Sequence, residues 1–274
     1  MVAFAANSLL NRAALLDGET GPAAFAALRM ISGAVCLSTL VVLRRGGDGR
    51  TADTNRWPGA AALALYMLGF SFAYVALDAG VGALILFGVV QVTMFAGGIA
   101  GGERPAIGRW VGTGLALLGL AWLAAPNGAG NLPAVPVLLM VAAAIGWGVY
   151  SLIGRQASDP LRDSATSFLF ASPVALLVWF ILPDGLSMTG AILAVVSGAI
   201  TSGLGYALWY SVLPRLDASV AALSQLTVPV IAVLGGVVFL GEAPGLRTVL
   251  ASVVILGGVA LGILSQRKSG SSGS

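Results

Sequence analysis

The chain has 274 residues, of which 58% are hydrophobic and only 9% charged, and its formal net charge is +3. A soluble domain carries about 25% charged residues, so this composition, with a mean hydropathy of +0.95, excludes an ordinary water-soluble globular protein. The sequence contains no histidine and a single cysteine, Cys36. An internal disulfide and a Ser-His-Asp catalytic arrangement are therefore excluded, and a protein metal site lacks its usual ligands.

Apolar runs of about 20 residues, the length that crosses a hydrocarbon layer about 30 Å thick, follow one another along the chain. They predict an all-α integral membrane protein with ten transmembrane helices. The predicted helices are residues 2–15, 22–43, 57–77, 80–100, 106–125, 133–153, 165–182, 189–212, 218–240 and 245–265. Residues 269–274, which contain only serine and glycine, are interpreted as a tag or linker remnant.

The basic residues lie in short loops between the apolar runs, a pattern typical of membrane orientation and not of a nucleic-acid surface. When the N-terminus is placed in the cytoplasm, nearly all lysines and arginines fall on the cytoplasmic side, whereas Arg12 and Arg247 fall on the other. We therefore expect a multi-pass protein of the inner membrane, surrounded by lipid, with both termini cytoplasmic and no nucleic-acid partner.

Two parts of the sequence repeat at a constant offset. Residues 78–84 resemble residues 217–223, and residues 103–105 resemble residues 242–244; both pairs lie 139 positions apart (242 − 103 = 139). Because each half would hold five helices, an odd number, the second half must insert upside down, as in many secondary transporters. The predicted N-terminal and C-terminal five-helix repeats are residues 1–126 and 133–268.

Two of the predicted helices carry aromatic and hydroxyl side chains four residues apart, which places them on one helix face. Aromatic walls with few polar groups suit small amphipathic solutes, so we expect both faces to line one central cavity between the halves. Simple packing between helices is the alternative. These candidate residues are Tyr66, Phe70 and Tyr74 in one helix, and Ser202, Tyr206, Trp209 and Tyr210 in the other.

Gln225 is the first candidate for a polar contact with a substrate. Pro229 lies four residues later and cannot donate to the Gln225 carbonyl, so this position offers a side-chain amide and a free backbone acceptor. An amide that bonds to an adjacent helix is the alternative. Further substrate-binding candidates are Gln91 and Thr93 in the fourth predicted helix, Asn7 in the first, and Trp147 and Ser151 in the sixth.

Arg29 is the one charge well inside an apolar run. It could hold a substrate carboxylate, but we expect a structural role, in which the side chain snorkels or bonds backbone carbonyls near the helix end. All eleven acidic residues lie in loops or at helix ends, so an obvious proton relay is missing. Glu103 and Glu242 are expected to cap helix starts and to tie loops together.

Residues 206–244 resemble the second conserved repeat of EamA-type carriers of the drug/metabolite transporter superfamily. The resemblance lies in the aromatic eighth helix, the segment from Leu223 to Val230, and Leu240-Gly241-Glu242, which Gly102-Glu103-Arg104-Pro105 matches in the first half. It implies ten helices in two inverted halves and export of small metabolites by alternating access, with the YddG-like amino-acid exporters as the most similar group. The Lys/Arg pair of sugar-phosphate carriers and the membrane-embedded glutamate of small multidrug pumps are absent, which favours a neutral or zwitterionic solute.

The sequence thus predicts a bacterial inner-membrane exporter of amino acids, including aromatic and other neutral ones, and of related metabolites. We expect it to act as a monomer and a uniporter, without a cofactor, a metal or enzymatic activity. An exporter of lipophilic cationic drugs, held by cation–π contacts, and a non-transporting membrane protein are the alternatives.

Overall fold

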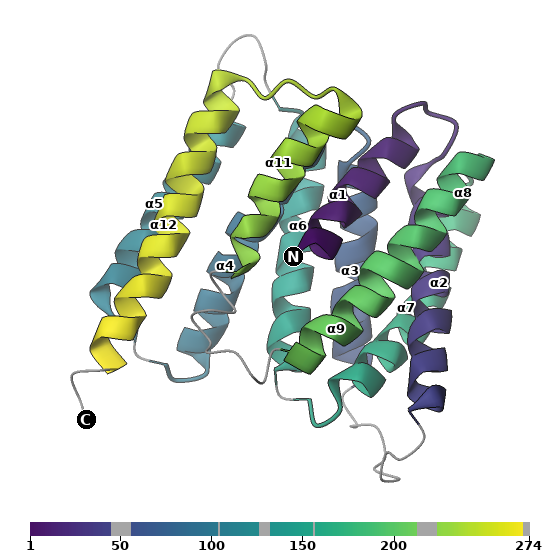
Figure 1. Cartoon of the computed structure of the whole chain (residues 1–274), viewed down its shortest axis with the longest axis horizontal. Coiled ribbons are helices and arrows are strands. Elements are labelled where there is room, and N and C mark those ends of the chain that lie inside the picture. The colour runs from purple at the N-terminus through teal and green to yellow at the C-terminus, as the bar shows by residue number, and fades with distance from the viewer. Residues whose placement is uncertain (45–55, 104, 126–131, 156, 213–223, 271–274) are drawn as a thin grey trace.

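The computed structural model describes residues 1–44, 56–103, 105–125, 132–155, 157–212 and 224–270, and every element in these ranges is a helix (Figure 1). In chain order the first helices are α1 (Val2–Leu15), α2 (Pro22–Leu43), α3 (Arg56–Ala73), α4 (Ala79–Ala100), α5 (Ile107–Ala124) and α6 (Ala134–Gly154). They are followed by α7 (Pro160–Ile181), α8 (Met188–Val195), the π-helix η1 (Val196–Leu204), α9 (Gly205–Val212), α11 (Thr227–Leu240) and α12 (Leu246–Gly270).

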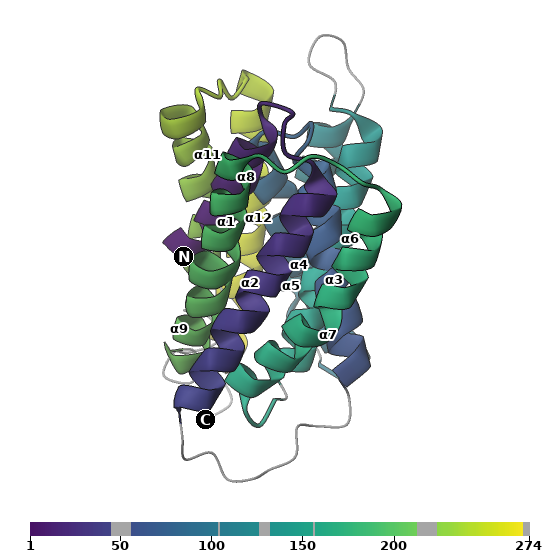
Figure 2. The ribbon, with the colours of Figure 1, turned by 90° about the vertical axis from the view of Figure 1, so that its right-hand side faces the viewer.

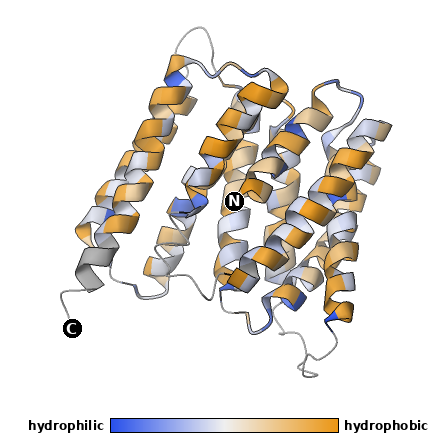
Figure 3. Ribbon diagram, in the orientation of Figure 1, coloured by the Kyte–Doolittle hydropathy of each residue, from blue (hydrophilic) through white to orange (hydrophobic). Residues whose placement is uncertain are grey.

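The surface of the helices is strongly apolar. Within the described ranges, seven helical segments have at least 18 residues and a composition apolar enough to cross a membrane, and the apolar segments Trp57–Ala73 of α3 and Thr227–Leu240 are shorter. Large side chains point outward, among them Ile107, Phe180 and Phe239, which are 81%, 84% and 78% exposed. Figure 3 shows hydrophobic residues along the flanks of the bundle. Hydrocarbon solvates such flanks, whereas in water they would associate.

The predicted helix boundaries need correction at the starts of α7 and α11 and at the end of α3, which is Ala73 and not residue 77. α7 begins at Pro160 and not at residue 165, because the Asp159 side chain accepts a hydrogen bond from the Arg162 backbone N–H (3.3 Å) and proline suits the first helical position. α11 begins at Thr227, and the loop and repeat predicted at 214–223 lie outside the described residues. The predicted count of ten transmembrane helices stays a prediction.

Helices α5 and α12 pack side by side at one edge of the molecule (Figure 1). Their backbones touch at Gly112 and Gly258, since a Cβ atom added to Gly112 would lie 2.4 Å from the Gly258 carbonyl oxygen. In lipid, apolar burial does not drive helices together, so close approach of small residues supplies the contact. The pair therefore depends on these two positions.

The loops at the upper end of the molecule in Figure 1 are joined across the sequence. Asp184, between α7 and α8, accepts hydrogen bonds from the backbone N–H groups of Ala23 (2.8 Å) and Ala24 (2.9 Å). A carboxylate thus caps the N-terminus of α2, where it complements the helix dipole. Gly21 must be small there, because a Cβ would lie 2.0 Å from the Asp184 carboxyl carbon. Figure 2 shows how this joint holds the start of α2 beside the turn between α7 and α8.

Candidate functional site

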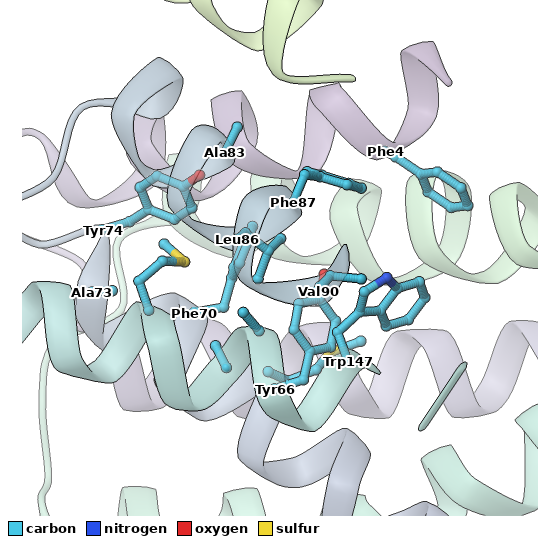
Figure 4. Close-up of a cluster of buried hydrophobic side chains, with 14 of the residues drawn as sticks. Phe4, Tyr66, Phe70, Ala73, Tyr74, Ala83, Leu86, Phe87, Val90 and Trp147 are labelled. Carbon is cyan, nitrogen blue, oxygen red and sulfur yellow. The ribbon is translucent and has the colours of Figure 1, made fainter. Parts of the chain in front are cut away.

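Five buried rings meet in the interior, and we call them the aromatic cluster: Phe4 of α1, Tyr66 and Phe70 of α3, Trp147 of α6, and Tyr206 of α9. The Trp147 ring centroid lies 5.0 Å from Tyr66, 5.2 Å from Tyr206 and 6.3 Å from Phe4. Phe70 joins through Tyr66 at 5.4 Å. Figure 4 shows Trp147 between Tyr66 and Phe4. The cluster brings together four predicted candidates and Phe4, which the sequence did not single out.

A set of buried polar side chains lies next to the aromatic cluster, and we call it the polar group: Asn7, Arg29, Ser197, Thr201 and Ser202. Asn7 Oδ1 accepts hydrogen bonds from the hydroxyls of Ser197 (2.9 Å) and Thr201 (2.5 Å). Arg29 Nη2 donates to Ser202 Oγ at 3.2 Å. The polar group joins α1, α2 and η1 at a depth where unpaired polar groups are costly.

The π-helix η1 supplies three members of the polar group. In a π-helix each backbone bond spans five residues and not four, so the regular spacing that predicts one continuous face through Ser202, Tyr206 and Tyr210 is interrupted. Ser202 faces Arg29 and Asn7, whereas Tyr206 joins the aromatic cluster. The side chain of Tyr210 lies outside the described residues.

Tyr74 and Trp209 lie at the margins of the aromatic cluster. The Tyr74 ring contacts Phe70 at 4.7 Å, and its hydroxyl donates to the Ala79 carbonyl (3.2 Å), so Tyr74 ties the end of α3 to the start of α4. Trp209 is half-buried, with its ring 6.1 Å from Phe4. Tyr74 thus belongs to the upper end of the molecule as much as to the interior.

Two of the hydroxyl groups predicted to contact a substrate form hydrogen bonds to the backbone of their own helices. Thr93 donates to the Val89 carbonyl (2.9 Å), and Ser151 donates to the Trp147 carbonyl (2.7 Å). Both residues are half-buried, as is Gln91 on α4. Their role in binding a substrate stays a prediction.

Gln225 is half-buried and lies just before α11. Because α11 begins at Thr227, Pro229 falls in the first turn, where backbone N–H groups have no partner within the helix. The helix is interrupted at residue 226, so Gln225 lies at an interrupted backbone. Its contact with a substrate stays a prediction.

Arg29 is the residue that sequence reasoning underestimated. It has no exposed surface, so it does not snorkel. Its guanidinium contacts the hydroxyls of Ser202 and Tyr66, and its carbon centre lies 5.0 Å from the ring centroid of Phe70 and 5.7 Å from that of Tyr66. The signal in the sequence was its place as the one charge inside an apolar run.

Glu242 forms a second joint at the upper end. Its carboxylate accepts a hydrogen bond from the Ala79 backbone N–H (2.8 Å), which caps α4, and it lies 3.8 Å from Arg12 Nε. Arg12 in turn donates to the Tyr74 carbonyl at the end of α3 (3.0 Å). Burial raises the pKa of Glu242 and the charge of Asp78 raises it further, while the Ala79 N–H and Arg12 oppose the shift. Glu242 therefore caps a helix start and ties loops together, as predicted.

The substitution Glu242→Gln is expected to flatten the pH dependence of thermal unfolding. Because the pKa of Glu242 is raised in the folded protein, its contribution to stability is complete below the ordinary value of 4.5 and is lost as the pH rises through the raised value. The unfolding temperature of the wild type in detergent should fall across that window. The glutamine keeps an acceptor for the Ala79 N–H and should remove this part of the fall.

Glu103→Gln is the matched control for this measurement. Glu103 pairs with Arg109 (3.1 Å) at the opposite end of the molecule, and its side chain is 45% exposed. This variant should follow the wild type. Equal slopes for the wild type and Glu242→Gln would contradict the assignment.

Known proteins are similar to this chain over most of its length. Residues 134–264 match the sequence profile of the EamA-like transporter family. An uncharacterized protein of Pseudomonas aeruginosa is 48% identical and covers 97% of this chain and 92% of its own length. An uncharacterized transporter of Archaeoglobus fulgidus is 22% identical, covering 87% of each chain, and the uncharacterized transporter YwfM of Bacillus subtilis is 26% identical, covering 84% of this chain and 80% of its own.

A solved crystal structure that is 22% identical superposes with a TM-score of 0.68 and covers 98% of this chain and 97% of its own, which shows a shared fold. Residues 134–264 therefore carry a match to the EamA-like transporter family, and the apolar helices together with relatives named as transporters indicate a multi-pass membrane transporter.

Proposed function

We propose that this membrane transporter exports amino acids, including aromatic and other neutral ones, and related small metabolites across the bacterial inner membrane. Transport proceeds by alternating access between two inverted five-helix halves, with both termini in the cytoplasm. A single copy of the chain carries the solute as a uniporter. The observation that carries the proposal is the aromatic cluster beside the polar group, because it combines apolar walls with a few converging polar side chains.

The arrangement of the helices supports two inverted halves. Helices at corresponding places in the two halves run in opposite directions in Figure 1, as α1 and α6 do, and α4 and α11. Corresponding helices also pack against each other: α2 with α7, α4 with α11, and α5 with α12. Such contacts are expected around a pseudo-two-fold axis in the membrane plane.

The two joints at the upper end support alternating access. The first joins Asp184 to the start of α2, and the second joins Glu242 to the start of α4 and to Arg12. In both, a carboxylate holds together segments that lie far apart in the sequence. Release of these joints would open the upper end toward the aromatic cluster, and their closure would leave access to the other side.

The chemistry of the interior favours a solute with negative or balanced charge. Arg29 is the charged member of the polar group and has no exposed surface. A buried guanidinium repels a cation, so the alternative of a lipophilic cationic drug receives no support from this site.

Flux measurements in liposomes test the proposal. The purified protein should carry labelled L-phenylalanine and L-leucine down their gradients and should show counterflow, because a uniporter exchanges solute across a loaded membrane. An imposed pH gradient should drive no accumulation. Absence of flux for every amino acid would overturn the substrate class, and accumulation driven by the pH gradient would overturn the uniport mechanism.

A further inference from the structure

Arg29 lies deep in the molecule with an incomplete set of partners. It is the eighth residue of the 22-residue helix α2, about 10 Å from the start of the helix at 1.5 Å per residue. Nε and Nη2 contact the Ser202 hydroxyl at 3.4 and 3.2 Å, and Nη2 contacts the Tyr66 hydroxyl at 3.3 Å. Nη1 is buried and has no hydrogen-bond partner. The guanidinium thus has N–H donors on Nη1 that are free to bind another group.

These contacts are weak for a buried cation. They are longer than the usual 2.7–2.9 Å of a charge-assisted hydrogen bond, and both partners are neutral hydroxyls. Within the described ranges no carboxylate lies within 4.0 Å of Arg29, and the guanidinium lies over the rings of Phe70 and Tyr66. An arginine cannot lose its charge in a protein. The site therefore keeps a positive charge that the rings compensate only in part.

We propose that Arg29 binds the carboxylate of the transported solute, an inference that rests on the proposed function. The planar guanidinium presents two parallel donors to a carboxylate, and the unpartnered Nη1 completes such a pair with Nη2. The Ser202 and Tyr66 hydroxyls can then turn their protons toward the carboxylate oxygens. A single guanidinium balances one negative charge, which favours a carboxylate over a phosphate dianion.

The aromatic cluster then takes the apolar part of the solute. The Tyr66 ring lies beside Trp147 in that cluster (Figure 4). Its hydroxyl also contacts Arg29, so the two regions are continuous through Tyr66. A solute with a carboxylate at one end and an apolar side chain at the other matches this order. Neutral amino acids and arylalkyl carboxylates have this form.

Three small probes distinguish the groups of the solute: L-phenylalanine, 3-phenylpropionate, which lacks the amine, and 2-phenylethylamine, which lacks the carboxylate. Each is added to the purified full-length protein in detergent, and its dissociation constant is taken from the shift in unfolding temperature. We expect L-phenylalanine and 3-phenylpropionate to raise the unfolding temperature of the wild type. The dissociation constant of 2-phenylethylamine should be at least tenfold higher than theirs. A preference for the amine, or no shift with either carboxylate, would overturn the assignment.

Variants of Arg29 give the second part of the test. Arg29→Met removes the charge with little change in volume, and it should raise the dissociation constants of both carboxylate probes at least tenfold. Arg29→Lys keeps the charge without the two parallel donors and should retain part of the affinity. It also provides the test if Arg29→Met fails to fold. Arg247→Met, at a half-buried arginine bonded to the carbonyls of Trp122 and Ala125, is the control and should bind the three probes as the wild type does.

The outcomes separate this inference from the proposed function. Carboxylate binding that is unchanged in both Arg29 variants overturns the inference, even when L-phenylalanine flux is found. Arg29-dependent binding of 3-phenylpropionate without amino-acid flux keeps the carboxylate site and overturns the amino-acid exporter. A purely structural arginine would lower the unfolding temperature of Arg29→Met and leave the ranking of the three probes unchanged.

Discussion

Gly112→Val is expected to lower the stability of the protein in detergent by about 3 kcal/mol, at the upper end of the usual cost of overpacking. A side chain at this position meets backbone and not a movable side chain, because its Cβ would lie 2.4 Å from the Gly258 carbonyl oxygen and 2.6 Å from the Gly262 nitrogen. Helices α5 and α12 must then separate along their contact. Thermal unfolding and size-exclusion chromatography measure the loss.

Gly114→Val is the matched control in the same helix. A Cβ at Gly114 meets nothing within 4 Å, so this variant should stay within about 0.5 kcal/mol of the wild type, as surface substitutions do. The partner helix offers the same comparison, with Gly258 in the contact and Gly257 outside it. Equal stability of Gly112→Val and Gly114→Val would show that the backbone contact does not hold the pair together.

Trp147→Ala should destabilise the protein by about 3–5 kcal/mol, the usual cost of truncating a buried large aromatic residue. The Trp147 ring contacts Tyr66, Tyr206, Phe4 and Tyr150, with centroids 5.0 to 6.3 Å apart, so its removal leaves a gap shared by several helices. Amino-acid flux should be lost as well, because these rings form the proposed apolar wall. Unfolding temperature and liposome flux give the two measurements.

Trp147→Phe should retain more of the stability and of the amino-acid flux than Trp147→Ala does, since a phenyl ring fills much of the gap. Trp57→Ala serves as the control, because Trp57 is 68% exposed at the start of α3 and should change stability by less than about 1 kcal/mol. A Trp147→Ala protein that unfolds at the wild-type temperature would remove the aromatic cluster from the account of how the helices pack.

The sequence predicts the helices well because the length and apolarity of a run are local properties. The structure places described helices close to the predicted runs, and the start of α7 could have been read from Asp159 and Pro160 as a cap followed by proline. The aromatic residues of the candidate site were also visible, since rings at four-residue spacing share a face of an α-helix.

The polar group could not be predicted in the same way. Arg29 and Ser202 are 173 positions apart, so their contact depends on how α2 packs against η1. Gly198 allows that packing, because a Cβ there would lie 2.1 Å from the Arg29 carbonyl oxygen. The π-helix itself has no clear mark in the sequence, since its extra residue per turn is stabilised by contacts such as those with Asn7.

The two carboxylate caps at the upper end also set an order for biosynthesis. α2 and α4 emerge from the ribosome early, yet their first turns are completed by Asp184 and Glu242, which are synthesised 160 and 163 residues after the N–H groups that they accept. Until those residues arrive, the early helices expose unsatisfied amides near the membrane surface. The first turns of α2 and α4 can therefore be capped only after the C-terminal half has been synthesised. A chain truncated before Asp184 would lack both caps and would be more susceptible to quality-control proteases.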